Sequence, residues 1–159
     1  MNSAFLSPLR VELVCPWSSD GTGQWQLTRT FSYYSALLQR VVDVPLGFST
    51  DFATVPKLPL VYLVHGGRYA RPAVVHDFLC RQGYILRNRA DRVFLEAMRV
   101  ENAEELKALA ASGADVSEID ERAQGLEARA YSMYLAVAFY TRTGRWKTEV
   151  DDPDYEPVA

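Results

Sequence analysis

Three motifs between residues 44 and 98 of this 159-residue chain each place an aspartate in apolar sequence, and one of them adds a histidine. Asp51 follows a threonine in the run TDFATVP, His76 and Asp77 are adjacent, and Asp91 begins a second apolar stretch. A buried carboxylate costs free energy unless it is hydrogen-bonded, paired or bound to a cation. These four side chains therefore indicate a shared site rather than separate positions in a core.

The spacing of His76 and Asp91 suits general-base chemistry. If each residue lies on a helix and a short turn joins the two helices, the stagger between the two positions is about 5 Å, within side-chain reach. An aspartate that accepts from one imidazole nitrogen fixes the tautomer and leaves the other nitrogen for a water or a metal. We therefore expect Asp51, His76 and Asp91 to converge as catalytic residues, with Asp77 at the rim and the acids able to hold a divalent ion.

Structural explanations compete for each of these residues. Asp91 could form a capping box with Asn88, and Asp51 could brace the proline-bearing loop as an Asx-turn. Cys80 lies four residues after His76, on the same helix face, where packing is the ordinary role of a cysteine. His65 follows an apolar run and precedes two glycines, which favours a loop position.

Composition excludes some classes of protein. The formal net charge is −3, so no overall positive field favours nucleic acid. No run of eighteen apolar residues is present, so we expect no transmembrane segment. Cys15 and Cys80 lack the spacing of a metal site and read as reduced thiols of a protein made in the cytoplasm.

The predicted fold class is α+β, because the apolar period changes from two to 3.6 near Pro72. A small N-terminal antiparallel sheet should pack against a C-terminal helical half that contains an antiparallel helix hairpin. Strands are expected at residues 9–14, 24–34 and 37–44, the first two forming a hairpin or part of a meander. The organisation predicted is one domain over residues 1–148, in which residues 102–123 are a helical insertion, followed by an acidic tail over residues 149–159.

Four helices are expected in the second half of the chain. The first begins near Pro72 and ends at about Gln82, where Gly83 supplies a stop. The next begins at the N-cap Asn88 and carries the apolar stripe that follows Asp91. A separate helix over residues 101–112 should begin at the cap Asn102, and a connector over residues 114–119 leads to a long helix over 121–143. Aromatic residues surround that last helix, which predicts burial on more than one side.

The motifs resemble a known family. The sequences VPLGFSTDFATVP at residues 44–56, HDFL at 76–79 and ADRVFLEAM at 90–98 are similar to the phage and prophage family catalogued as domain of unknown function 1353. The resemblance covers residues 25–98 and, more weakly, 133–146. Thr54 stands where the family usually has Ser, and Cys80 where it usually has Tyr. The resemblance implies a phage-encoded protein from a tail or lysis context.

A second resemblance concerns the helix pair alone. His-Asp on one helix, followed by Ala-Asp on an antiparallel helix, is similar to the core of phospholipase A2, notably the parvovirus capsid type. That likeness implies His76 as general base, Asp77 as a calcium ligand, and Asp91 as the residue that orients His76. Zinc is the other divalent ion expected as a candidate cofactor. The glycine-rich calcium loop of those enzymes is not recognisable in this chain.

Three classes of function follow. The first is a hydrolase acting on the bacterial cell envelope, through phospholipid esters or peptidoglycan, with His76 as base. The second is a metal phosphohydrolase that also uses His65, although the separation from His76 is short for that fold. The third is a non-enzymatic virion or tail component, partnered by other phage proteins, whose acid cluster joins loop to helices. The host cytoplasm is the expected location during synthesis, and the virion tail the alternative destination.

Overall fold

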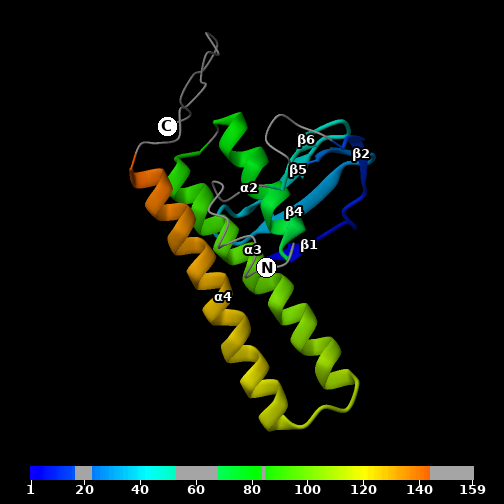
Figure 1. The fold of residues 1–159 in the computed structure, drawn as a ribbon, viewed down its shortest axis with the longest axis vertical. Helices are drawn as coiled ribbons and strands as arrows, with labels where there is room; N and C mark the ends of the chain where they lie inside the picture. Colours follow the sequence, from blue (N-terminus) through cyan, green and yellow to red (C-terminus); the bar gives the residue numbers. More distant parts are fainter. Residues whose placement is uncertain (17–22, 53–67, 84, 144–159) are drawn as a thin grey trace.

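The computed structural model describes residues 1–16, 23–52, 68–83 and 85–143, and it has an antiparallel β half followed by three helices (Figure 1). The predicted α+β class is therefore confirmed. The elements are β1 (Ala4–Phe5), β2 (Val11–Cys15), β3 (Gln24–Leu27), β4 (Phe31–Ser35), β5 (Arg40–Val44), β6 (Ser49–Thr50), α2 (Ala70–Gln82), α3 (Arg87–Ala111) and α4 (Val116–Arg142).

The strands form two three-stranded antiparallel sheets, in the orders β1-β4-β5 and β2-β3-β6. The predicted pairing of the first two runs is present as the β2–β3 ladder. The predicted strand over residues 24–34 is wrong in one respect, because it is two strands in two different sheets. The polar residues Thr28, Arg29 and Thr30 separate them and form a bend in the chain.

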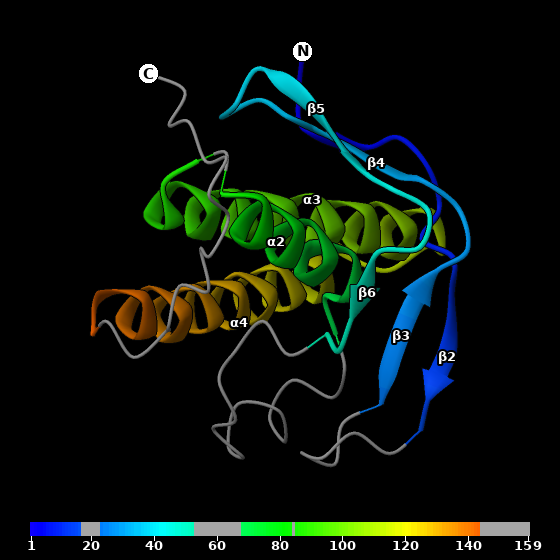
Figure 2. The same ribbon diagram turned by 90° about the horizontal axis from the view of Figure 1, so that it is seen from above.

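Figure 2 shows three layers, with the strands β4 and β5 on one side, α2 and α3 in the middle and α4 on the far side. The middle layer has one apolar cluster on each side. Toward the strands, Val74 and Val93 pack with Phe31 and Val44. Toward α4, Phe94 and other residues of α3 form a second buried cluster, whose members from α4 are Ala130, Met133 and Val137.

Helix α3 is longer than the sequence indicated. It is one continuous helix of 25 residues, so the predicted separate helix over residues 101–112 is wrong. The proposed cap Asn102 lies inside it, buried, and its side chain bonds the hydroxyl of Tyr69 and the carbonyl of Leu126. Asn88 is likewise not the cap, because the helix begins at Arg87 and Leu86 holds the cap position.

Helix α4 also differs from its prediction. It begins at Val116, within the expected connector, because the side chain of Asp115 accepts from the backbone N–H of Glu118 and caps the first turn. Only one face is covered: Tyr131 and Leu135 are about half exposed, and Phe139 is 70% exposed. The expectation that α4 is buried on more than one side is therefore wrong. No helix of the described residues is long and apolar enough to span a membrane.

Glu96 joins α3 to the β half. One carboxylate oxygen accepts from Ser3 Oγ at 2.8 Å and from the backbone N–H of Leu37 at 2.8 Å. The other accepts from Tyr33 OH at 3.1 Å and Ser35 Oγ at 2.6 Å. Four donors from one sheet and its turns therefore converge on one acid of the helix that carries Asp91, which fixes that helix relative to the sheet.

Candidate functional site

Helix α2 carries two adjacent polar residues inside an apolar sequence. It forms because Val74, Val75, Phe78 and Leu79 recur with helical spacing and are buried. It ends as predicted at Gly83, whose φ of 64° belongs to the left-handed region that glycine adopts at helix ends. His76 and Asp77 are 4% and 8% exposed, so both need partners inside the protein.

His76 and Asp91 make the contact that the helix spacing predicts. The distance between His76 Nε2 and Asp91 Oδ1 is 2.9 Å, and it joins α2 to α3 across a buried interface. Because an ionised carboxylate only accepts, Nε2 is the donor, and Nδ1 is the nitrogen left to act as a base. The ring of Phe94 lies 5.1 Å from the imidazole, centroid to centroid, and restricts the ring's orientation.

The second oxygen of Asp91 is unusual. Asp91 is 1% exposed, and its Oδ2 is buried with no hydrogen-bond partner among the described residues. A buried acceptor without a donor costs about 1–3 kcal/mol. Asp91 therefore does not act as a capping residue with Asn88. Its Oδ1 accepts from His76, and its Oδ2 stays available as an acceptor.

Asp77 points to a different element. Its Oδ2 accepts from Thr50 Oγ1 at 2.7 Å, and the same hydroxyl oxygen accepts from the backbone N–H of Phe52 at 3.0 Å. Burial raises the pKa of Asp77, the Thr50 bond and the charge of His76 lower it, and the charge of Asp51 raises it again, for a net increase. Asp77 thus lies inside the protein rather than at the rim, and it links α2 to β6.

Asp51 lies at the edge of this group. It is half-buried, it follows Thr50 directly, and its carboxylate is close enough to Asp77 to influence the pKa of that residue. Phe52, the next residue, has a φ of 56°, a left-handed conformation that is strained for a residue with a side chain. The chain therefore leaves β6 through a constrained backbone at Phe52. The catalytic role expected of Asp51 stays a prediction.

The sulfur of Cys80 lies within hydrogen-bonding distance of the His76 ring, in addition to packing in the helix interface. Its Sγ lies 3.5 Å from Nε2 and 4.0 Å from Nδ1 of His76. Burial lowers the pKa of His76, but the Cys80 sulfur, the bond to Asp91 and the charge of Asp77 outweigh it and raise that pKa to about 10. In this arrangement the imidazole is a strong base that holds a proton at neutral pH.

A metal ion is also expected at Asp77. Whether such an ion fits depends on the other side chains that could coordinate it. Within residues 1–16, 23–52, 68–83 and 85–143, no three His, Cys, Asp or Glu side chains are grouped so as to hold a metal ion. Asp77 already accepts from Thr50. The described residues do not by themselves make a metal centre. His65 lies outside the described residues.

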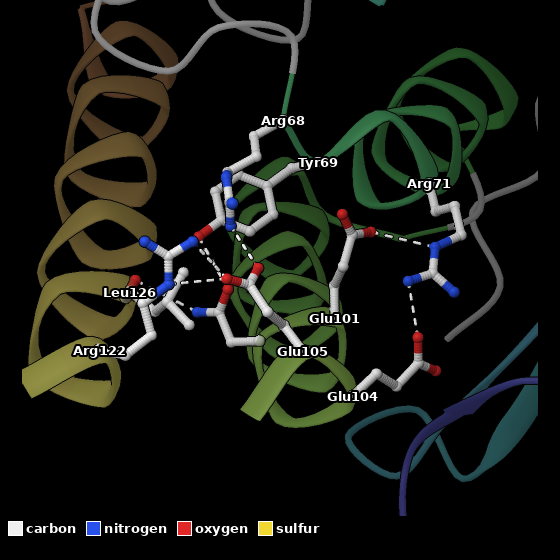
Figure 3. A network of polar contacts seen from close by, with 9 residues as sticks. Arg68, Tyr69, Arg71, Glu101, Glu104, Glu105, Arg122 and Leu126 are labelled. Carbon is white, nitrogen blue, oxygen red and sulfur yellow. Dashed lines mark hydrogen bonds and ion pairs between the residues drawn. The ribbon is translucent and has the colours of Figure 1, made fainter. Parts of the chain in front are cut away.

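A second polar network fixes the beginning of α2 (Figure 3). Arg68 and Arg122 converge on Glu105, while Arg71 reaches Glu101 and Glu104. Tyr69, in a left-handed conformation with φ of 69°, donates from its hydroxyl to Asn102 at 2.9 Å. These contacts tie α2 to α3 and α4 and hold His76 in register with Asp91.

Two residues that support the site could not be identified from the sequence. Thr50 belongs to a quoted motif, yet only the fold brings its hydroxyl to Asp77. The donors of Glu96 come from residues about sixty to ninety positions earlier, so no local pattern marks it. A hollow of about 910 Å³ is lined by Glu96, Arg99 and Tyr131 among others, and none of the four predicted site residues borders it.

Fold and site together define a small α+β protein with a buried His–Asp pair between two packed helices and a second acid held by a strand. A model of the family described as "Protein of unknown function (DUF1353)" matches residues 25–112. The match covers more than half of the chain and includes all four predicted site residues, so the protein belongs to this family. No curated protein and no solved structure matches it.

Proposed function

We propose that this protein is a hydrolase in which His76 is the general base. The observation that carries the proposal is the 2.9 Å contact between His76 Nε2 and Asp91 Oδ1. With Nε2 held by a carboxylate, Nδ1 takes a proton from an attacking water, and Asp91 stabilises the positive ring that results. This is the relation between base and orienting acid that the likeness to phospholipase A2 implies.

The proposed substrate class is an ester or amide of the bacterial cell envelope, with phospholipid esters first and peptidoglycan second. It rests on the phage context that the family resemblance implies and on the His–Asp pair. Asp51 and Asp77 are proposed to line the same site from the β6 side. A divalent ion bound at Asp77 stays a prediction, which elemental analysis of the purified protein tests.

One observation favours a second candidate, a virion or tail component without catalysis. His76 and Asp91 are 4% and 1% exposed, as expected of a buried ion pair that fastens one helix to another. A working base must reach solvent or substrate at some stage of turnover. Hydrolysis by the purified protein separates the two candidates.

The pH profile of hydrolysis provides the sharpest test. A base acts only when unprotonated, and the pKa of His76 is raised to about 10, so kcat/KM should increase as the pH rises from 7 toward 10. Cys80→Ala removes the largest of the influences that raise this pKa, so the rising limb should move to lower pH. Cys15→Ala changes the end of strand β2, remote from His76 in sequence, and should leave the pH profile unchanged.

The assay follows fatty-acid release from phospholipid vesicles and release of soluble fragments from purified peptidoglycan, each with added calcium, magnesium or zinc and with a chelator. Activity on either substrate with an alkaline limb supports the proposal. An absence of turnover on both substrates in every condition would reject it and leave the structural candidate.

A further inference from the structure

Cys80 is a nucleophilic group that the proposed hydrolysis does not use. It is half-buried, one turn of α2 after His76, and free of any disulfide. We propose that Cys80 is a reactive thiol, activated by His76, which takes small soft electrophiles and hydroperoxides.

The contacts of the ring carry this proposal. The sulfur lies 3.5 Å from Nε2 and 4.0 Å from Nδ1 of His76, so a ring N–H lies beside it and can donate to it. The ring itself is held against Asp91 and Phe94, so it cannot swing away from the sulfur without breaking a buried contact. The thiolate is the nucleophilic form of cysteine, so a thiol beside a ring N–H is the one expected to react first.

A second observation concerns the acid that holds the same ring. Asp91 Oδ2 is buried and without a partner among the described residues, beside the ring that the sulfur contacts. Such an acceptor suits a ligand that carries an O–H donor. A hydroperoxide has one, and so does the sulfenic acid that it forms with a cysteine.

The reaction balances with those partners alone. The Cys80 thiolate attacks one oxygen of the hydroperoxide, an S–O bond forms and the O–O bond breaks. The sulfur loses two electrons to the peroxide, and the departing hydroxide or alkoxide takes the proton of the His76 imidazolium. The products are a cysteine sulfenic acid, water or an alcohol, and a neutral imidazole.

The second cysteine of the chain gives an internal control. Cys15 also forms no disulfide and is half-buried, but it lies at the end of strand β2, on a different element from His76 and Cys80. Both thiols meet the same reagent, pH and temperature in one sample. A difference between their reaction rates therefore reflects the protein environment of each cysteine.

The experiment alkylates the folded protein with iodoacetamide at pH 7 and follows each cysteine by peptide mass spectrometry. Cys80 should react at least about tenfold faster than Cys15. The two rates should become similar in concentrated guanidinium chloride, which removes the fold. His76→Gln, which keeps a donor for Asp91 but carries no charge, should slow Cys80 and leave Cys15 unchanged.

Hydrogen peroxide with a sulfenic-acid trap tests the second half of the proposal, and the trapped adduct should form on Cys80 before it forms on Cys15. Equal rates in the folded protein, or a slower Cys80, would overturn the proposal. The comparison of folded with unfolded wild type decides it even if His76→Gln does not fold. The measured reaction rates of the thiols do not depend on hydrolysis. Failure of the thiol proposal therefore does not refute the proposed hydrolase, and the reverse also holds.

Discussion

Replacement of His76 by alanine and by glutamine should separate the stability of the site from its chemistry. His76→Ala leaves both oxygens of Asp91 buried without a donor, because Oδ2 has none among the described residues already. We expect a loss of about 2–4 kcal/mol in the free energy of unfolding. Glutamine places an amide N–H near the position of Nε2, so His76→Gln should cost only about 1 kcal/mol.

The two variants should be alike in activity, since neither retains a basic ring nitrogen. Removal of a general base lowers the rate by about 100-fold to 10,000-fold. Denaturant unfolding and the vesicle or peptidoglycan assay are run on the same preparations. A folded His76→Gln protein with wild-type activity would show that His76 is not the base, and an unchanged stability of His76→Ala would show that Asp91 does not depend on it.

Loss of the carboxylate at Glu96 should destabilise the protein more than loss of any exposed acid. Glu96→Ala removes the acceptor of four donors, among them the hydroxyls of Tyr33 and Ser35, two residues with 0% exposure. Donors left buried without an acceptor cost about 1–3 kcal/mol each, and partial relaxation brings the expected total to about 3–5 kcal/mol.

Glu104→Ala is the matched control for Glu96. Glu104 lies on the same helix, its side chain is 48% exposed, and its described ion pair is with Arg71. An exposed ion pair contributes at most about 1 kcal/mol, so this variant should stay close to wild type in denaturant unfolding. Comparable losses in the two variants would contradict the role assigned to Glu96 as the link between sheet and α3.

The parts of the fold that local spacing determines could be predicted from the sequence. Helix α2 and its end at Gly83 follow from an apolar period and a glycine. The pairing of His76 with Asp91 follows from the positions of both residues on either side of one short turn. Each of these inferences needed only neighbours along the chain.

The parts that distant partners determine could not be predicted. Asn102 resembles a helix cap in sequence, but Tyr69 and Leu126 satisfy its side chain from two other elements, so α3 continues through it. Glu96 and Thr50 acquire their roles only when the sheet reaches the helices. The sequence indicates only packing for Cys80. Its contact with the His76 ring could not be predicted, because the position of that ring depends on its contact with Asp91.

Nitrogen-15 NMR of the imidazole rings tests the central claim most directly, namely that Asp91 holds Nε2 of His76 and leaves Nδ1 as the base. The chain has two histidines, so His76→Gln assigns the signals. We predict that both nitrogens of His76 are protonated at pH 7 and that Nδ1 loses its proton near pH 10 while Nε2 keeps its own. A ring that titrates near 6.5, or a neutral ring with its proton on Nδ1, would contradict the account.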